Sequence, residues 1–248
     1  MIEPFFFSDE RIFGCYHPSS ESSSTRMLII CPPLFDEYRR SYKALADLAN
    51  ACATQGVHVL RFDYFGTGES FGSLEDARLS DWISDIDASI DEGIALTGAE
   101  HVVLAGVRFG ATLAAQSRHS GIRRYVFWDP VASGAVYLDW LSSVNERLEA
   151  GHKWLSRYFN VKIDNLDYEN FHLVEELKTG IRQIVFSQKE CDEAAESHVI
   201  TTSKQIFDSG IFSNCEFPGL EYDWPPYHDG VLTHKPVLEA IARKVLEH

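Results

Sequence analysis

Four short, largely apolar runs, each followed by turn-forming residues, recur through the first half of the chain. They cover residues 27–31, 57–62, 101–105 and 125–128. Strands that are buried on both faces of a parallel sheet have this pattern. Apolar residues at helical spacing separate the runs, over residues 40–54, 79–96 and about 110–119. This alternation predicts an α/β fold with a doubly wound, mostly parallel sheet.

Shorter elements complete the predicted order on both sides of this region. An alternating segment predicts an opening hairpin, with residues 5–7 paired to residues 12–16. Later in the chain we expect a strand at 182–187, a helix at 194–208, a short strand at 215–217 and a closing helix at about 235–246. No repeat or low-complexity linker divides the sequence, so residues 1–248 are predicted to form one domain. The last three residues, 246–248, look like the remnant of a cloning tag.

An aromatic-rich segment at residues 134–180 interrupts the alternation. It contains tryptophan, tyrosine and phenylalanine residues among many charges. One interpretation is a helical insertion that acts as a lid and encloses an apolar ligand above the strand ends. The other is that the aromatic side chains simply pack the insertion onto the domain, and both can hold together.

Charge and cysteine content narrow the classes of function. The formal net charge is −15, which argues against broad nucleic-acid binding and against docking on an anionic membrane. No apolar run is long enough to predict a membrane span, and the first residues do not resemble a signal peptide. Five scattered cysteines without ligand spacing favour reduced thiols in a cytoplasm. The sequence predicts no metal site and no cofactor.

Chemically distinctive residues stand at the predicted carboxyl ends of the strands. Leu34, Asp63, Arg108 and Asp129 each come directly after, or within three residues of, such an end. Because ligand sites in doubly wound sheets gather at this edge, we expect the functional site there. Arg108 is the centre of a Gly-x-x-x-Gly turn between a predicted strand and a helix of small residues.

Four stretches of the chain resemble the α/β-hydrolase superfamily, in its serine-aminopeptidase-like and lipase- or thioesterase-like branch. They are Pro-Pro-Leu-Phe at 32–35, the Asp-x-x-Gly-x-Gly-x-Ser pattern at 63–70, Gly-Val-Arg-Phe-Gly at 106–110, and His228 before the closing helix. The resemblance extends over about residues 5–245. It is closer still to the hydrolase-like proteins that are encoded with bacterial exosortase systems, some of which also have arginine in place of the serine.

The resemblance implies a role for each matching position. In these hydrolases, residues 106–110 would form the nucleophile elbow, Gly-x-Ser-x-Gly, with serine at its centre. Arg108 stands there instead, and a guanidinium is no nucleophile. His228 matches the catalytic base, and His234 is the second candidate, which would more simply cap the final helix.

The remaining roles in the resemblance are the triad acid and the oxyanion donors. Asp192, Glu190 or Cys191 would hold the acid position after the strand at 182–187, and Asp129 is the alternative. The oxyanion donors would be the main-chain N–H groups of the residues next to the elbow and the first loop. These are Phe109 together with Leu34 or Phe35.

Three interpretations of Arg108 follow, and the sequence leaves them open. Arg108 is a structural replacement that pairs with Asp129 or Asp192, because a buried arginine needs a partner. Alternatively it binds the carboxylate, phosphate or enolate of a small acyl- or carboxylate-bearing molecule, with or without non-covalent catalysis. In the third, the chain still hydrolyses esters or thioesters, with water activated by His228 or with another nucleophile such as Cys191. The sequence predicts no oligomeric state.

Overall fold

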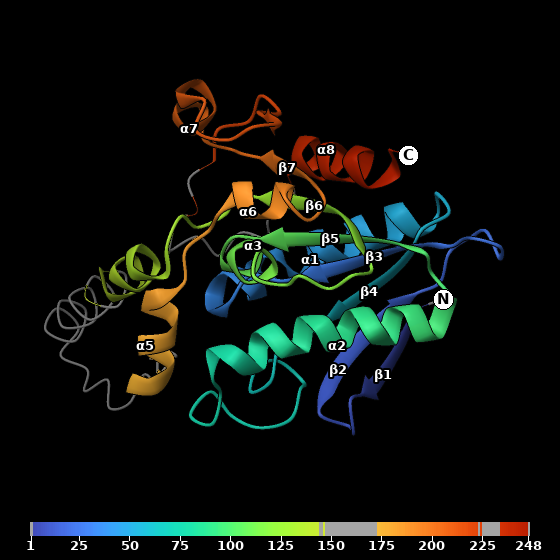
Figure 1. Cartoon of the computed structure of the whole chain (residues 1–248), viewed down its shortest axis with the longest axis horizontal. Helices are drawn as coiled ribbons and strands as arrows, with labels where there is room; N and C mark the ends of the chain where they lie inside the picture. Colours follow the sequence, from blue (N-terminus) through green and yellow to red (C-terminus); the bar gives the residue numbers. More distant parts are fainter. Residues whose placement is uncertain (1, 144–145, 147–172, 223, 225–233, 248) are drawn as a thin grey trace, which may run out of the picture.

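An eight-stranded, mostly parallel sheet forms the centre of the molecule (Figure 1). The computed structural model describes residues 2–143, 146, 173–222, 224 and 234–247. The strands lie in the order β1-β2-β4-β3-β5-β6-β7-β8, and β2 is antiparallel to both of its neighbours. Their bounds are β1 Glu3–Phe7, β2 Ile12–His17, β3 Arg26–Cys31, β4 His58–Phe62, β5 His101–Val107, β6 Ile122–Trp128, β7 Glu196–Ile200 and β8 Cys215–Glu216.

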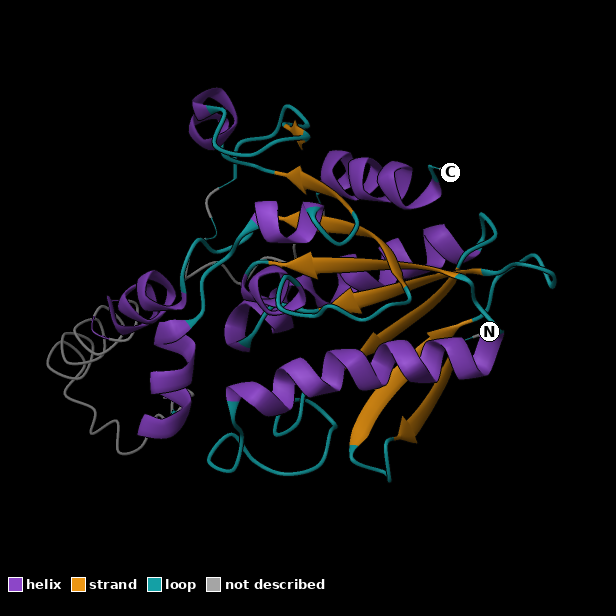
Figure 2. Cartoon of the chain, in the orientation of Figure 1, coloured by secondary structure: helices purple, strands orange, loops and turns teal. Residues whose placement is uncertain are grey.

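Helices cover both faces of the sheet (Figures 1 and 2). Their bounds are α1 Phe35–Ala53, α2 Leu79–Thr97, α3 Phe109–Ala114, α5 Glu175–Gln183, α6 Gln188–Asp192, α7 Lys204–Ser209 and α8 Lys235–Leu246. Alternate side chains of β3 divide between the two faces because successive residues of a strand point to opposite sides. Met27 and Ile29 pack in the core that contains Ile90 of α2, whereas Leu28 and Ile30 pack in the core of α1 and α8.

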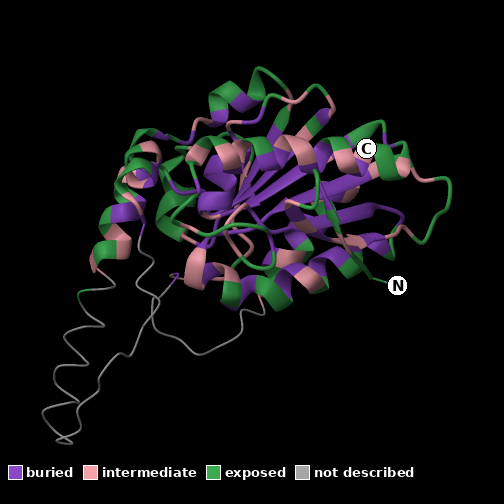
Figure 3. Ribbon diagram, turned by 90° about the horizontal axis from the view of Figure 1, so that it is seen from below, coloured by how far each residue is buried: buried purple, intermediate pink, exposed green. Residues whose placement is uncertain are grey.

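The helix ends follow from local sequence. Pro32 and Pro33 end β3, and α1 then begins with two acidic residues in its first turn, which favourably oppose the positive end of the helix dipole. Gly98 ends α2 in the left-handed conformation (φ +67°), where a residue without a side chain is least strained. Figure 3 shows the result: the strands are almost wholly buried and the helices expose their outer surfaces.

Most of the predicted elements in the first half are confirmed. The opening hairpin forms with Phe7 opposite Ile12, and the four apolar runs are β3, β4, β5 and β6. The helix expected at about 110–119 is shorter than predicted, since α3 ends at Ala114. The strand at 215–217 and the closing helix are confirmed as β8 and α8.

Two predictions in the second half are wrong. Residues 182–187 are not a strand: α5 continues to Gln183, and only Val185 forms an isolated bridge, with Ser133. Residues 196–200 are not helical, because they form β7 beside β6. Leu177 and Ile181 of α5 and Ile184, in extended backbone directly after it, are all buried, so a helix end and the turn that follows it produce the apolar pattern at 182–187.

The aromatic-rich segment is helical where the structure describes it. Residues 134–143 are helical, α5 follows near its end, and 144–145 and 147–172 lie outside the described residues. A Cβ on Gly134 would lie 1.7 Å from the main-chain oxygen of Ile181, so the two ends of the segment pack closely. Its function as a lid stays a prediction. Among the helices described, none has the length and apolar content needed to cross a bilayer.

Candidate functional site

Arg108 occupies a strained turn between β5 and α3. Its backbone angles are φ +54° and ψ −123°, a combination that side-chain-bearing residues rarely adopt. The Arg108 N–H donates to the main-chain oxygen of Trp128, 2.9 Å away, which holds the turn against the end of β6. A sharp, strained strand-to-helix turn of this kind presents the nucleophile in α/β-hydrolases, and here it presents an arginine.

The two glycines of the turn are required by close packing. A Cβ on Gly110 would lie 2.1 Å from the main-chain oxygen of Pro32, and a Cβ on Gly106 would lie 2.4 Å from the Cα of Ala111. Any larger residue would push α3 away from the loop that follows β3. The Gly-x-x-x-Gly spacing is therefore explained by the approach of two backbones.

The Arg108 guanidinium forms an ion pair with Glu37, in the first turn of α1. Arg108 Nε donates to Glu37 Oε1 at 2.9 Å, and the Tyr137 hydroxyl donates to the other carboxylate oxygen at 3.2 Å. The Glu37 side chain is 3% exposed and that of Arg108 is 19% exposed. Burial acts to lower the pKa of Arg108, but the charge of Glu37, its hydrogen bond to the guanidinium and the nearby Asp129 and Tyr137 together raise the pKa. Arg108 therefore carries a positive charge that Glu37 neutralises.

The predicted pairing of Arg108 with the carboxylate of Asp129 or Asp192 is wrong. Arg108 Nη1 reaches only the main-chain oxygen of Asp129, at 3.3 Å. The guanidinium also lies over the ring of Trp224, 5.2 Å from its centre. No local pattern in the sequence points to Glu37 as the partner. Its position in the helix that begins after the Pro-Pro loop could have suggested it, because that loop adjoins the elbow.

Asp129 lies at the carboxyl end of β6, and neighbouring donors surround its carboxylate. Thr201 Oγ1 and the Thr202 N–H donate to Oδ1 at 3.0 and 2.7 Å. Trp224 Nε1 and the Thr202 hydroxyl donate to Oδ2, the former at 2.9 Å. A triad acid must leave one oxygen for its histidine. In this structure the indole of Trp224 and the hydroxyl of Thr202 both bind Oδ2, so the carboxylate holds the ends of β6 and β7 and the side chain of Trp224 together.

The three other candidate acids lie away from the carboxyl ends of the strands. Because β7 begins only at Glu196, all three precede it instead of following a strand. Asp192 accepts hydrogen bonds from Ser197 and Ser213, near the amino end of β7. Glu190 pairs at the surface with Arg118. Cys191 is buried, which raises its pKa to about 11 and makes the reactive thiolate scarce at neutral pH.

Of the two candidate histidines, the structure describes His234 and not His228. His228 lies outside the described residues, so its assignment as the base stays a prediction. His234 is the residue before α8, but its side chain makes no capping hydrogen bond. Its ring packs edge-on against Tyr222, 4.1 Å between centres, and against Trp128. Burial lowers the pKa of His234, which favours the neutral ring at neutral pH.

The expected oxyanion region lies beneath aromatic rings. Phe109 is the first residue of α3, where an N–H has no acceptor within the helix, and Leu34 precedes α1. Phe35 has a positive φ of +57°. Tyr137, from the helical 134–143 segment, stacks on Phe109 with 4.8 Å between ring centres and on Phe35 with 6.4 Å. The structure thus brings the predicted donor residues together and covers them with a residue of the aromatic-rich segment.

Ser70 has a structural function in the loop at 63–70. Its hydroxyl donates to the main-chain oxygen of Asp63 at 2.6 Å and accepts the N–H of Phe13 at 2.9 Å. Gly68 has a φ of +53°, and a Cβ there would lie 2.1 Å from Asp63 Oδ2. Tyr38 of α1 donates to the other Asp63 oxygen. The motif therefore ties the end of β4 to the hairpin and to α1.

Comparisons with known proteins were made by sequence and by structure. No protein-family model matches the sequence, and no curated protein is significantly similar to it. Among solved structures, an α/β serine hydrolase homologue from Coxiella burnetii superimposes over 99% of this chain and 95% of its own, with 14% identity and a TM-score of 0.54. The bottromycin epimerase BotH, in complex with bottromycin A2, superimposes over 99% and 98%, with 17% identity and a TM-score of 0.53.

Shorter matches include an α/β serine hydrolase without a lid from Xanthomonas campestris, at 20% identity and a TM-score of 0.44. That alignment covers 53% of this chain and 62% of the other, and two Agrobacterium proteins are matched over 55% and 60% of their lengths. The chain therefore spans less than two thirds of these proteins. The two full-length superpositions, together with the mostly parallel eight-stranded sheet, show that the chain has the α/β-hydrolase fold.

Proposed function

We propose that this chain uses the α/β-hydrolase fold without forming an acyl-enzyme at its elbow, and that Arg108 is a structural replacement for the nucleophile. The observation that carries the proposal is the buried contact of Arg108 with Glu37 and of Glu37 with Tyr137. A cation that is already neutralised by an internal carboxylate gains less from binding an external anion. The elbow then acts as a packing element between β5, α1 and the 134–143 segment.

Two further contacts support the absence of serine-type catalysis. The carboxylate of Asp129 already has several donors, including Trp224. The ring of Tyr137, which is 1% exposed, lies on Phe109, whose N–H would stabilise an oxyanion. Phe109 is fully buried, so a substrate carbonyl could reach its N–H only after neighbouring side chains had moved. Without a serine at the elbow, a free acid at Asp129 and an accessible N–H at Phe109, only the weak residual catalysis that comes from binding would remain.

The test is hydrolysis of p-nitrophenyl butyrate by the wild type and by an Arg108→Ser/Glu37→Gln variant. The second substitution removes the carboxylate that serine would leave unpaired, so the restored elbow is tested in a folded protein. We expect no turnover above buffer from either, because the covering ring and the occupied Asp129 remain. A burst of p-nitrophenol from the double variant, or wild-type turnover that falls on His228→Ala substitution, would overturn the proposal. A serine esterase assayed in parallel controls for substrate quality.

A second candidate function is the binding of a small acyl- or carboxylate-bearing molecule at the elbow. Arg108 favours it, since its side chain keeps 19% exposure while its guanidinium lies over the ring of Trp224. Butyrate would then compete with Glu37 for the guanidinium. A Glu37→Gln substitution should strengthen the rise in melting temperature that butyrate causes, and an additional Arg108→Met substitution should abolish it. No rise in the Glu37→Gln variant would exclude this function.

A further inference from the structure

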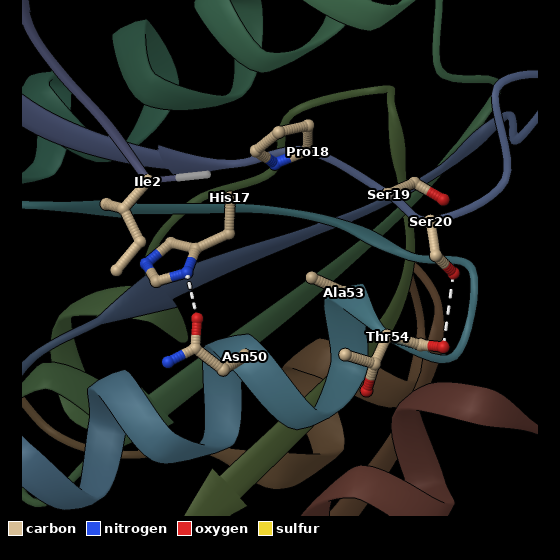
Figure 4. A pocket seen from close by; sticks show the side chains of 8 residues that line it. All are labelled: Ile2, His17, Pro18, Ser19, Ser20, Asn50, Ala53 and Thr54. Atoms are coloured by element: carbon tan, nitrogen blue, oxygen red, sulfur yellow. Dashed lines mark hydrogen bonds between the residues drawn. The ribbon is translucent and has the colours of Figure 1, made fainter.

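A cavity of about 450 Å³ lies at the far end of α1 from the elbow (Figure 4). It is bounded by Ile2, by His17 at the end of β2 with residues 18–20 after it, and by Asn50 and Ala53 in the last turn of α1 with Thr54 after it. Because β2 is antiparallel to β4, with His17 opposite Val59, the cavity lies at the amino ends of the parallel strands. Glu37 and Asn50 are separated by about 20 Å along the helix. The cavity is thus distinct from the elbow.

The hydrogen bonds of His17 determine how Asn50 faces this cavity. Arg61 Nε donates to His17 Nε2 at 3.2 Å, and a guanidinium can only donate, so Nε2 carries no proton. The proton of the neutral ring is therefore on Nδ1, which lies 2.9 Å from Asn50 Oδ1. An N–H needs an acceptor, so the Asn50 amide must present its oxygen to His17. Its Nδ2 atom is turned away from the ring, as Figure 4 shows.

This chain of contacts holds the Asn50 amide in one orientation. Arg61 is 8% exposed and lies over the ring of Tyr42, 5.0 Å from its centre, and His17 is 2% exposed. Asn50 lines the cavity and is exposed, and within the described part of the chain its Nδ2 atom has no protein acceptor, so it is open to a ligand that enters from solvent. A fixed donor in a partly apolar cavity is the arrangement by which ligand pockets orient a hydrogen-bond acceptor.

The lining carries no formal charge. Burial lowers the pKa of His17, and the Arg61 guanidinium adds to this effect, so the ring is neutral at neutral pH. Ile2, Pro18 and Ala53 supply apolar walls. The Ser20 hydroxyl is already directed at the main-chain oxygen of Thr54, at 3.1 Å. An ionic ligand would lose its hydration here without gaining a counter-charge, whereas an uncharged one would not.

We propose that this cavity binds a small uncharged molecule with an apolar body and a carbonyl oxygen, and that the carbonyl accepts a hydrogen bond from the Asn50 side-chain amide. The carbonyl of an amide, ester or lactone has the required acceptor and lacks a charge. The site is independent of the function proposed for the elbow, and either one can fail without the other.

The experiment uses 2-cyclohexylacetamide as the probe and cyclohexylacetate as its isosteric anion, each titrated into the ¹⁵N-labelled full chain and followed by NMR. The amide should shift the Asn50 side-chain signals and the main-chain signals of Ser20 and Thr54, with a Kd on the order of millimolar for about ten non-hydrogen atoms. The carboxylate should bind about tenfold more weakly, because it must be desolvated without a partner.

Two variants test the assigned contacts. Asn50→Asp keeps an acceptor for His17 but removes the donors, so affinity for the amide should fall about tenfold or more. Thr54→Trp places a large ring at the mouth without altering the His17–Asn50 pair, and it should also abolish binding. Gln55→Glu adds the same charge outside the lining and should leave the affinity unchanged.

The proposal is overturned if the amide does not bind, or if the amide and the carboxylate bind equally well. It is also overturned if signals far from the cavity shift instead, or if Thr54→Trp binds like the wild type. Thr54→Trp decides the question even if Asn50→Asp does not fold. None of these measurements depends on the elbow, so they do not bear on whether Arg108 has replaced a nucleophile.

Discussion

The contact of Arg108 with Glu37 predicts a strong dependence of stability on both residues. An Arg108→Met substitution keeps the aliphatic part of the side chain over Trp224 but removes the charge. Glu37, at 3% exposure, would then be a buried carboxylate whose remaining described donor is the Tyr137 hydroxyl. Removing one partner of a buried ion pair costs about 3–5 kcal/mol in the free energy of unfolding.

A double-mutant cycle separates the ion pair from the packing. In the Arg108→Met/Glu37→Gln variant, a neutral amide can still accept from Tyr137, so the loss of stability should fall to about 1–2 kcal/mol. The coupling energy between the two positions should therefore be at least ~2 kcal/mol. Urea unfolding followed by tryptophan fluorescence gives these values, and the single Arg108→Met substitution should lower the melting temperature by about 6–20 °C.

A surface pair provides the matched control. Lys43 and Asp47 are 2.6 Å apart, but their side chains are 61% and 49% exposed. Lys43→Met should change the stability by less than about 0.5 kcal/mol, because exposed pairs are screened by water. The reasoning is refuted if Arg108→Met is as well tolerated as Lys43→Met, or if the cycle shows no coupling between positions 37 and 108.

Two other predictions concern a buried tryptophan and a buried carboxyl group. Trp224→Phe removes one donor to the Asp129 carboxylate and should lower the free energy of unfolding by about 1.5–3 kcal/mol; an unchanged urea midpoint would show that this contact is dispensable. Burial raises the pKa of Asp85 from 3.8 to about 6, so the folded state binds the carboxyl proton more tightly than the unfolded state does. The free energy of unfolding therefore falls as the pH rises from about 4 through 6, where the folded protein loses this proton. Asp85→Asn should therefore gain ~3 kcal/mol relative to the wild type between about pH 4 and about pH 7 in pH-dependent unfolding, and parallel profiles would contradict the assignment.

The sequence was sufficient for the strands that contain a run of at least three large apolar side chains or lie within a clear alternation, and insufficient for β7, which has only two apolar residues at its end. β3 and β6 contain runs of large apolar side chains that are buried on both faces. β7 reads Glu-Ser-His-Val-Ile, and its buried polar residue Ser197 is accommodated by a hydrogen bond to Asp192. Tertiary partners of this kind leave no periodic signal, so the strand was assigned to the wrong segment.

The same limit applies to the candidate site. The elbow could be located because glycines at 106 and 110 and the apolar strand before them are local features. The partner of Arg108 could not be identified, because residues 37 and 108 are far apart in the sequence and many carboxylates were available. Asp129 was placed correctly at a strand end, but its binding to Trp224 depends on a segment almost a hundred residues later.

The pairing of Arg108 with Glu37 also constrains how this lineage can change. Serine at position 108 alone would leave the Glu37 carboxylate buried beside Tyr137 with no cation, so this single change would meet a folding defect before any hydrolytic activity could be selected. If the Glu37 charge were lost first, serine at position 108 would be tolerated, but the loss of that charge brings no catalytic benefit by itself. The ion pair therefore acts as an evolutionary constraint, which retains the arginine because a change at either position alone lowers the stability.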